Sequence, residues 1–181
     1  ALAWADDTVW AGTQAGLARF DGQNWQPFGG ASPEQVGPAV SALAVAPSGE
    51  LWAATSEASN RLRTYDGRAW TTVSLPTPTM FIAQMAVTAA GQLVAVAYDD
   101  GVVLLGIYDG RAWAWHASEA LQLEPRWLDV APDSRLWLTG LARDTVALPE
   151  VVDALRPGAP EQTSDDRHVV AVFELGPQGL G

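Results

Sequence analysis

Short apolar stretches recur along the first 140 positions and are separated by turns rich in Gly, Pro and Asp. Residues 40–45, 82–87 and 127–130 are such stretches. Runs of four to eight residues that close at a turn residue are typical of β-strands. No segment before residue 140 keeps the period of an amphipathic helix. The pattern therefore predicts a chain of short antiparallel strands rather than a helical array.

The predicted strands follow one another in a repeated order, because two short phrases recur. The phrase Tyr/Phe-Asp-Gly-x-x-Trp begins at intervals of 45 and 43 residues, at Phe20, Tyr65 and Tyr108. A second phrase, which contains a turn followed by Leu-Trp or similar residues, ends at intervals of 42, 42 and 43 residues, at Trp10, Trp52, Val94 and Trp137. Periods of this length are typical of β-propeller blades, each a four-stranded antiparallel sheet.

Each period is expected to contain four strands. The first is apolar, the second begins at Leu-Trp, the third ends at Tyr/Phe-Asp-Gly, and the fourth begins at the following Trp. The Asp-Gly step is a strong hairpin signal, because Gly accepts a positive φ and the Asp side chain binds its own backbone. We therefore predict an all-β fold, a β-propeller of about four four-stranded antiparallel blades, with the recurrent Trp residues packed between blades.

A single β-propeller domain, or a fragment of one, is expected to occupy residues 1–181. Its four repeats are assigned to residues of about 1–38, 39–79, 80–122 and 123–181. The chain begins inside a first strand and stops within a blade, so we expect an incomplete ring. A closed four-bladed ring is the alternative. Open blade faces are apolar, and monomers avoid exposing such faces. Further blades or a protein partner are therefore expected to cover them.

The repeat is lost after Gly140, where we predict a divergent insert near residues 143–167. A short helix is expected at residues 148–156, where a Pro stands near the start. Residues 169–173 are expected to form a strand. The third strand of the fourth blade is the favoured assignment, and the first strand of a fifth blade is the alternative. The insert is a candidate partner contact, because a blade does not need it.

Residues 8–25 read Thr-Val-Trp-Ala-Gly-Thr-Gln-Ala-Gly-Leu-Ala-Arg-Phe-Asp-Gly-Gln-Asn-Trp. This stretch resembles the two-component regulator propeller repeat, Val-Trp-x-Gly-Thr-x-x-Gly-Leu-x-Arg-Tyr-Asp-Gly-x-x-Trp. The resemblance extends over about residues 1–140. Ala54 stands where the family has Gly, Val94 replaces the Trp, and the fourth repeat keeps only the first half. The resemblance implies a propeller that acts as a sensor domain or as another secreted or surface module, in the periplasm or outside the cell.

Composition narrows the range of functions. Hydrophobic residues make up 48 % of the chain, which fits a globular protein. Its net charge of −11 repels phosphate backbones, so a nucleic-acid partner is not expected. Cysteine is absent, which excludes disulfides, Cys-ligated zinc and thiol nucleophiles. The longest apolar runs are too short to cross a bilayer, so no transmembrane segment is expected.

No set of residues points to catalysis. Asp21, Asp66 and Asp109 recur with the repeat, so we interpret them as turn residues of separate blades rather than a carboxylate site. His116 and His168 are the only histidines. The Gly-x-Leu-Trp turn resembles that of virginiamycin-type lyases, propellers that use histidine and a metal. Since His116 is expected in an outer strand, the two histidines should not converge. We predict no catalytic residue, no metal and no cofactor.

Binding in a propeller usually involves the loops at one face and the channel mouth. The candidate binding residues are the nonrepeating side chains near the starts of first strands, Met80, Phe81, Arg126 and Trp127. Phe81 and Trp127 suit the core of these strands equally well. The leading hypothesis is a noncatalytic binding or recognition propeller, an extracytoplasmic sensor-type or ligand-binding module. Its partner would be a protein, further blades, a small molecule or a glycan.

Two alternatives remain open. One is a structural or assembly subunit that docks into a larger complex through open blade faces. The other, placed third, is a lyase-like propeller enzyme.

Overall fold

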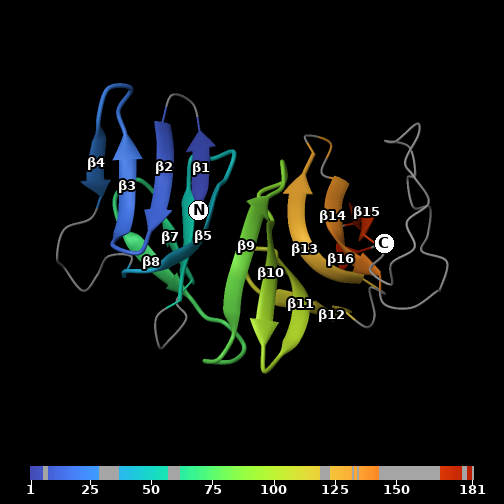
Figure 1. Cartoon of the computed structure of the whole chain (residues 1–181). Helices are drawn as coiled ribbons and strands as arrows, with labels where there is room; N and C mark the ends of the chain where they lie inside the picture. Colours follow the sequence, from blue (N-terminus) through green and yellow to red (C-terminus); the bar gives the residue numbers. More distant parts are fainter. Residues whose placement is uncertain are drawn as a thin grey trace.

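The protein is described by a computed structural model, which covers residues 1–5, 8–28, 37–56, 62–118, 123–131, 133, 135–142, 168–176 and 179–180. In these residues sixteen strands form four antiparallel sheets of four strands each (Figure 1). The predicted insert at residues 143–167, with its helix at 148–156, lies outside the described residues. No helix in the described part of the chain has the length and apolar character needed to cross a membrane.

Each sheet takes four consecutive strands. The first contains β1 (Leu2–Ala5), β2 (Thr8–Thr13), β3 (Gly16–Phe20) and β4 (Trp25–Phe28). The second contains β5 (Val40–Val45), β6 (Leu51–Thr55), β7 (Leu62–Tyr65) and β8 (Trp70–Val73). The third contains β9 (Phe81–Val87), β10 (Leu93–Asp99), β11 (Val102–Tyr108) and β12 (Trp113–Ala117). The fourth contains β13 (Leu123–Val130), β14 (Arg135–Ala142), β15 (His168–Gly176) and β16 (Gly179–Leu180). We name these sheets blades 1 to 4.

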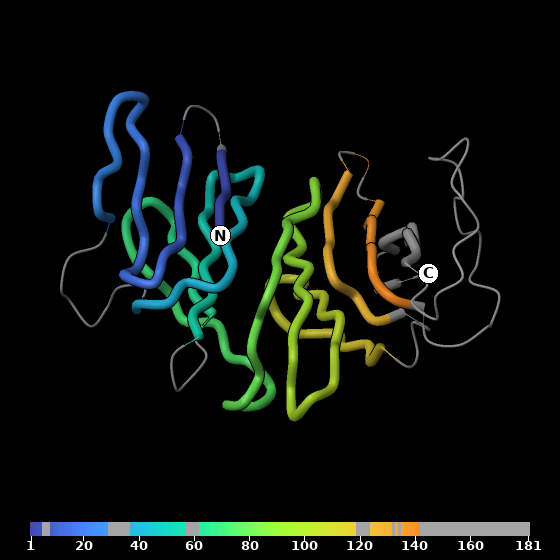
Figure 2. Tube along the Cα trace, in the orientation of Figure 1, coloured from blue at the N-terminus to red at the C-terminus, as the bar shows by residue number. Residues whose placement is uncertain are grey.

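Within each sheet, every strand pairs with the next one in the chain, which is the meander of a propeller blade. β15 pairs with β14 as the third strand of blade 4, so the favoured assignment of residues 169–173 is confirmed. The predicted fold class is confirmed as well, with four four-stranded antiparallel blades in an open arc. The inner strands β1, β5, β9 and β13 lie towards the middle of the arc, which does not close between blades 1 and 4 (Figures 1 and 2).

The Asp-Gly turns have the geometry that the sequence predicts. Gly67 and Gly110 have φ values of 95° and 94°, in the left-handed region that favours glycine. Asp109 Oδ1 accepts hydrogen bonds from the backbone N–H groups of Arg111 and Ala112, both at 2.8 Å. The Ala112 N–H, and then that of Arg111, lowers the pKa of the Asp109 carboxyl below its ordinary value. The repeated carboxylates therefore hold turns.

A bulge recurs at one place in three inner strands. The register skips one residue in each of β5, β9 and β13, at Ser41, Ala83 and Arg126. Hydrogen bonds join the inner strands of neighbouring blades beside these bulges. Gln84 Nε2 donates to the carbonyl oxygen of Arg126 at 2.6 Å, and Gln84 Oε1 accepts from the Leu128 N–H at 2.9 Å. These bonds connect blade 3 to blade 4.

In the described residues the core consists of three apolar clusters, and each cluster lies between two consecutive blades. Alternation along β10 shows why. Leu93 packs with Trp52 of blade 2, whereas its neighbour Val94 packs with Leu136 of blade 4. Side chains of successive strand residues point to opposite faces, so an interior blade must be apolar on both faces. Blade packing is therefore the main source of burial in this fold.

Candidate functional site

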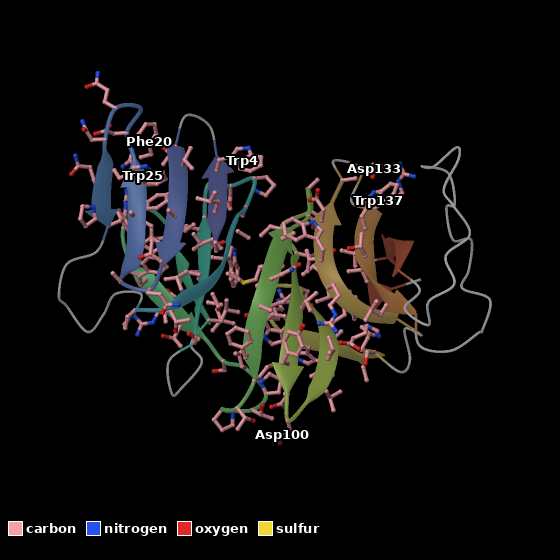
Figure 3. The ribbon with its side chains drawn as sticks, in the orientation of Figure 1. Trp4, Phe20, Trp25, Asp100, Asp133 and Trp137 are labelled. Carbon is pink, nitrogen blue, oxygen red and sulfur yellow. The ribbon has the colours of Figure 1, made fainter. Side chains whose placement is uncertain are left out.

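Blade 1 has one covered face and one open face. In β1 the side chain of Ala3 is buried against blade 2, while Leu2 and Trp4 on the opposite face are 66 % and 75 % exposed. Figure 3 shows Trp4 on the first sheet, together with Phe20 and Trp25. An exposed Trp beside an exposed Leu is unusual for a strand that belongs to an ordered sheet.

Strand pairing extends this face across the whole sheet. Trp4 pairs with Val9, Val9 with Phe20, and Phe20 with Trp25, and directly paired residues share a face. The rings of Phe20 and Trp25 lie 5.2 Å apart. We name eight of the residues on this side of the sheet the blade 1 free face: Leu2, Trp4, Val9, Ala11, Ala18, Phe20, Trp25 and Pro27. None of the eight carries a charge.

The equivalent face is buried in each later blade. Pairing with the second strand makes Leu2 equivalent to Leu43, Met85 and Leu128, which are 5 %, 9 % and 6 % exposed. Each of these three side chains packs against the preceding blade. The blade 1 free face is therefore the half of a blade interface that faces a preceding blade.

This finding corrects the prediction for one of the recurrent Trp residues. Trp70 and Trp113 pack in the clusters between blades, as the sequence predicts. Trp25 opens the fourth strand of blade 1 in the same way, yet it is 49 % exposed. The reason is its position, because these Trp side chains face the preceding blade and blade 1 has none before it among the described residues.

Among its described residues, blade 4 has an exposed side chain on the opposite side. Trp127 pairs with Thr139 and Asp129 pairs with Trp137, and these four residues lie on the face turned away from blade 3. We name Trp127, Asp129, Trp137 and Thr139 the blade 4 free face. Trp127 is 61 % exposed. Figure 3 shows Trp137 on the fourth sheet.

The structure places the four predicted binding residues in separate surroundings. Met80 is buried in the cluster between blades 2 and 3, so its side chain is covered by packing rather than open to a ligand. The Phe81 ring lies 6.4 Å from that of Tyr98. Arg126 forms an ion pair with Glu124 at 2.7 Å. Only Trp127 belongs to an open face, and a binding role for the four residues stays a prediction.

Sequence reasoning did not single out Leu2 and Trp4. A signal was present, because the equivalents of Trp4 in the other blades are Val45, Val87 and Val130. A Trp at a position that otherwise carries Val marks a departure from the repeat. Alignment of the first strands, in addition to the recurrent phrases, would have found it.

Among the described residues, the remaining titratable groups do not gather into one site. His116 lies in β12, the fourth strand of blade 3, as the sequence predicts. Asp99 accepts hydrogen bonds from the hydroxyls of Thr77 and Thr79, at 2.8 and 2.6 Å. Within the described residues no group of three or more His, Cys, Asp or Glu side chains is placed to hold a metal ion.

Comparison with known proteins identifies the fold. No protein-family model and no curated protein sequence matches the chain. The solved structure described as YCF48 bound to D1 peptide superposes with a TM-score of 0.51 and 22 % identity, over 77 % of this chain and 47 % of that chain. The β-propeller domain of Cps50 (Swd1) from Myceliophteria thermophila gives a TM-score of 0.47 and 11 % identity, over 74 % and 45 %.

The likeness to YCF48 shows a β-propeller fold, in agreement with the four meander sheets. The chain spans about half the length of the two proteins with which it was superposed.

Proposed function

We propose that this chain is a noncatalytic protein-binding β-propeller segment whose blade 1 free face is a contact surface. The observation that carries the proposal is the exposure of Trp4 and Leu2 on a sheet face without any charged residue. Contiguous apolar patches on a protein surface are typical of protein contacts.

The composition of the face supports a protein partner in particular. Trp and Phe bury large areas and are enriched among the residues that dominate binding energy. Full burial of one such side chain contributes about 1.5–3 kcal/mol. Trp4, which is 75 % exposed, has most of that burial still to gain when a partner covers it. YCF48 was solved with a bound D1 peptide, so peptide recognition is within the range of this fold.

We further propose that the chain is an extracytoplasmic sensor-type module. Its support is the sequence of residues 8–25, which resembles the two-component regulator propeller repeat. The absence of Cys and the strongly acidic composition are compatible with an exported domain.

A capture experiment with three forms of the chain tests the proposal. Wild type, Trp4→Ser and Val102→Ser are immobilised and incubated separately with the extracytoplasmic and the cytoplasmic fraction of the source cells. Val102 is a matched control, since it is an exposed apolar strand residue of blade 3, outside both free faces. We expect a protein from the extracytoplasmic fraction to bind wild type and Val102→Ser, and to be lost with Trp4→Ser.

Two results would contradict the proposal. Capture of the same proteins by all three forms would show that the blade 1 free face is not the contact surface. Capture that depends on Trp4 but occurs only from the cytoplasmic fraction would reject the extracytoplasmic role and keep the binding function.

A further inference from the structure

We propose that the blade 1 free face binds the blade 4 free face of a second copy of this chain, so that two open arcs close into one ring of eight blades. The inference rests on the proposed function, in which the blade 1 free face is a protein contact surface. It names the occupant of that face as another molecule of the same sequence.

The first argument comes from the three blade interfaces inside the chain. Each one joins a face turned towards the preceding blade to a face turned towards the next blade. Blade 1 has an exposed face of the first kind, and among the described residues of blade 4 Trp127 is exposed on a face of the second kind, with Trp137 and Thr139 half-buried beside it. The chain therefore carries both halves of an interface that it already forms three times.

The aromatic residues support the same pairing. Tyr108 of blade 3 meets Trp52 of blade 2, with ring centroids 6.0 Å apart. Phe20 is the blade 1 equivalent of Tyr108, since each ends a third strand and pairs with the first Trp of a fourth strand. Trp137 is the blade 4 equivalent of Trp52, by its place in the second strand. In the proposed contact, Phe20 of one copy packs against Trp137 of the other.

The arrangement of the blades allows the ring to close. Both end sheets border the open side of the arc, with β1 and β13 towards its middle (Figure 1). Two arcs of four blades give eight, within the four to eight blades that are typical of propellers. Each copy would place blade 1 on blade 4 of the other, which is a closed twofold arrangement that covers both named free faces of each copy.

The negative charge of the two copies opposes the contact. Asp129 stands on the blade 4 free face at a position where the other blades have Ala3, Ala44 and Ala86. Burial of a carboxylate without a partner is unfavourable, and two chains of net charge −11 repel one another. We therefore expect a reversible dimer that high salt strengthens, since salt screens the repulsion.

Analytical ultracentrifugation of the full chain tests the proposal over a range of about 1 to 200 µM, because mass action makes dimer formation depend on concentration. We expect wild type and Val102→Ser to dimerise alike. Trp4→Ser and Trp127→Ser, each of which removes one exposed Trp from one free face, should each weaken dimerisation at least about tenfold. Asp129→Ala, which restores the residue of the other blades, should strengthen it about tenfold. Circular dichroism checks that each variant remains folded.

Mixing the two weakened variants tests the pairing of unlike faces. When Trp4→Ser is combined with Trp127→Ser, one contact joins two altered faces and the other joins two intact faces. In either variant alone both contacts are altered, whereas in the mixed pair the two substitutions share one contact. Because losses within one contact are not additive, the mixture should dimerise more strongly than either variant alone. A contact between two like faces predicts no such recovery.

Three outcomes would overturn the inference. They are a chain that stays monomeric over the whole range, a dimer that neither Trp substitution weakens, and a mixture without recovery. A monomer that still captures another protein through Trp4 would overturn only the self-pairing and leave the proposed function standing. Loss of both dimerisation and Trp4-dependent capture would reject the two together.

Discussion

At the scale of single residues, one carboxylate accepts the backbone hydrogen bonds of each Asp-Gly turn. Asp21, Asp66 and Asp109 each accept two backbone N–H groups at distances of 2.8 to 2.9 Å. These hydrogen bonds to the charged form lower the pKa of each carboxyl from its ordinary value of 3.8. Since the pKa is lower in the folded chain, the stabilisation is fully present above about pH 4 and disappears as the pH falls through the folded value.

Substitution at Asp109 tests this role. We expect Asp109→Ala to lower the Tm at neutral pH, because two N–H groups lose their acceptor. Asp109→Asn keeps an acceptor oxygen and should lower the Tm less. The difference between wild type and Asp109→Ala should shrink as the pH falls below about 4. Thermal melts followed by circular dichroism measure it, and a difference independent of pH would contradict the prediction.

A second residue-scale prediction concerns Gly106 in β11. A Cβ atom at this position would lie 2.4 Å from the ring of Trp115 in β12, which pairs with it. We expect Gly106→Ala to destabilise the chain by about 1–3 kcal/mol through overpacking. Urea unfolding measures the loss. The same substitution should cost less when Trp115→Leu has removed the ring, and equal costs in the two backgrounds would reject steric conflict with Trp115 as the cause.

At the scale of elements, side chains at equivalent strand positions contribute different amounts to the free energy of unfolding in different blades. Leu93 in β10 and Val9 in β2 occupy equivalent positions, each paired with the end of a third strand. Leu93 is buried between blades 2 and 3, whereas Val9 lies on the blade 1 free face. Packing between whole blades, and not strand propensity, decides how much each side chain contributes to the stability of the fold.

Truncation at these two positions tests that conclusion. We expect Leu93→Ala to cost about 2–5 kcal/mol, since it leaves a cavity between two sheets. Val9→Ala in the monomer should cost less than about 1 kcal/mol, because no further blade covers it. Urea titrations at low protein concentration compare the two losses. Equal losses would indicate that the blade 1 free face is covered within the monomer.

At the scale of the whole molecule, the four blades differ in how they are covered. Among the described residues, blade 3 is packed on both faces and blade 1 on one. Opening of an end blade exposes a single interface, so it should require less free energy than opening of an interior blade. The end blades are therefore expected to be the least stable part of the arc.

Hydrogen exchange tests this gradient. We expect amides of β10 to exchange most slowly and those of β1 and β2 faster, because blade 1 opens without disturbing blade 3. Mass spectrometry of peptides from each blade gives the rates. At concentrations where the proposed dimer forms, the β2 amides should become slower, whereas in Trp4→Ser they should not. Uniform exchange across all four blades would contradict an open arc of unequal blades.

Much of the fold follows from the sequence, because the residues that specify a propeller blade lie close together in the chain. Turn positions, strand order and the identity of the third strand in blade 4 depend on residues close in the chain, such as the Asp-Gly steps and the apolar run near residue 170. The candidate site is different. Met80 and Trp127 have similar places in the sequence, near the start of a first strand, yet one is buried and the other exposed.

The sequence by itself determined the blades, since period, alternation and turn chemistry act within some 42 residues. Only the tertiary structure decided which blade faces are covered. Leu2 and Leu43 have equivalent sequence positions, but their exposure differs because a preceding blade packs against Leu43 and none of the described residues forms one against Leu2. Burial depends on what stands on the other side of a face, and the sequence of a single blade does not contain that information.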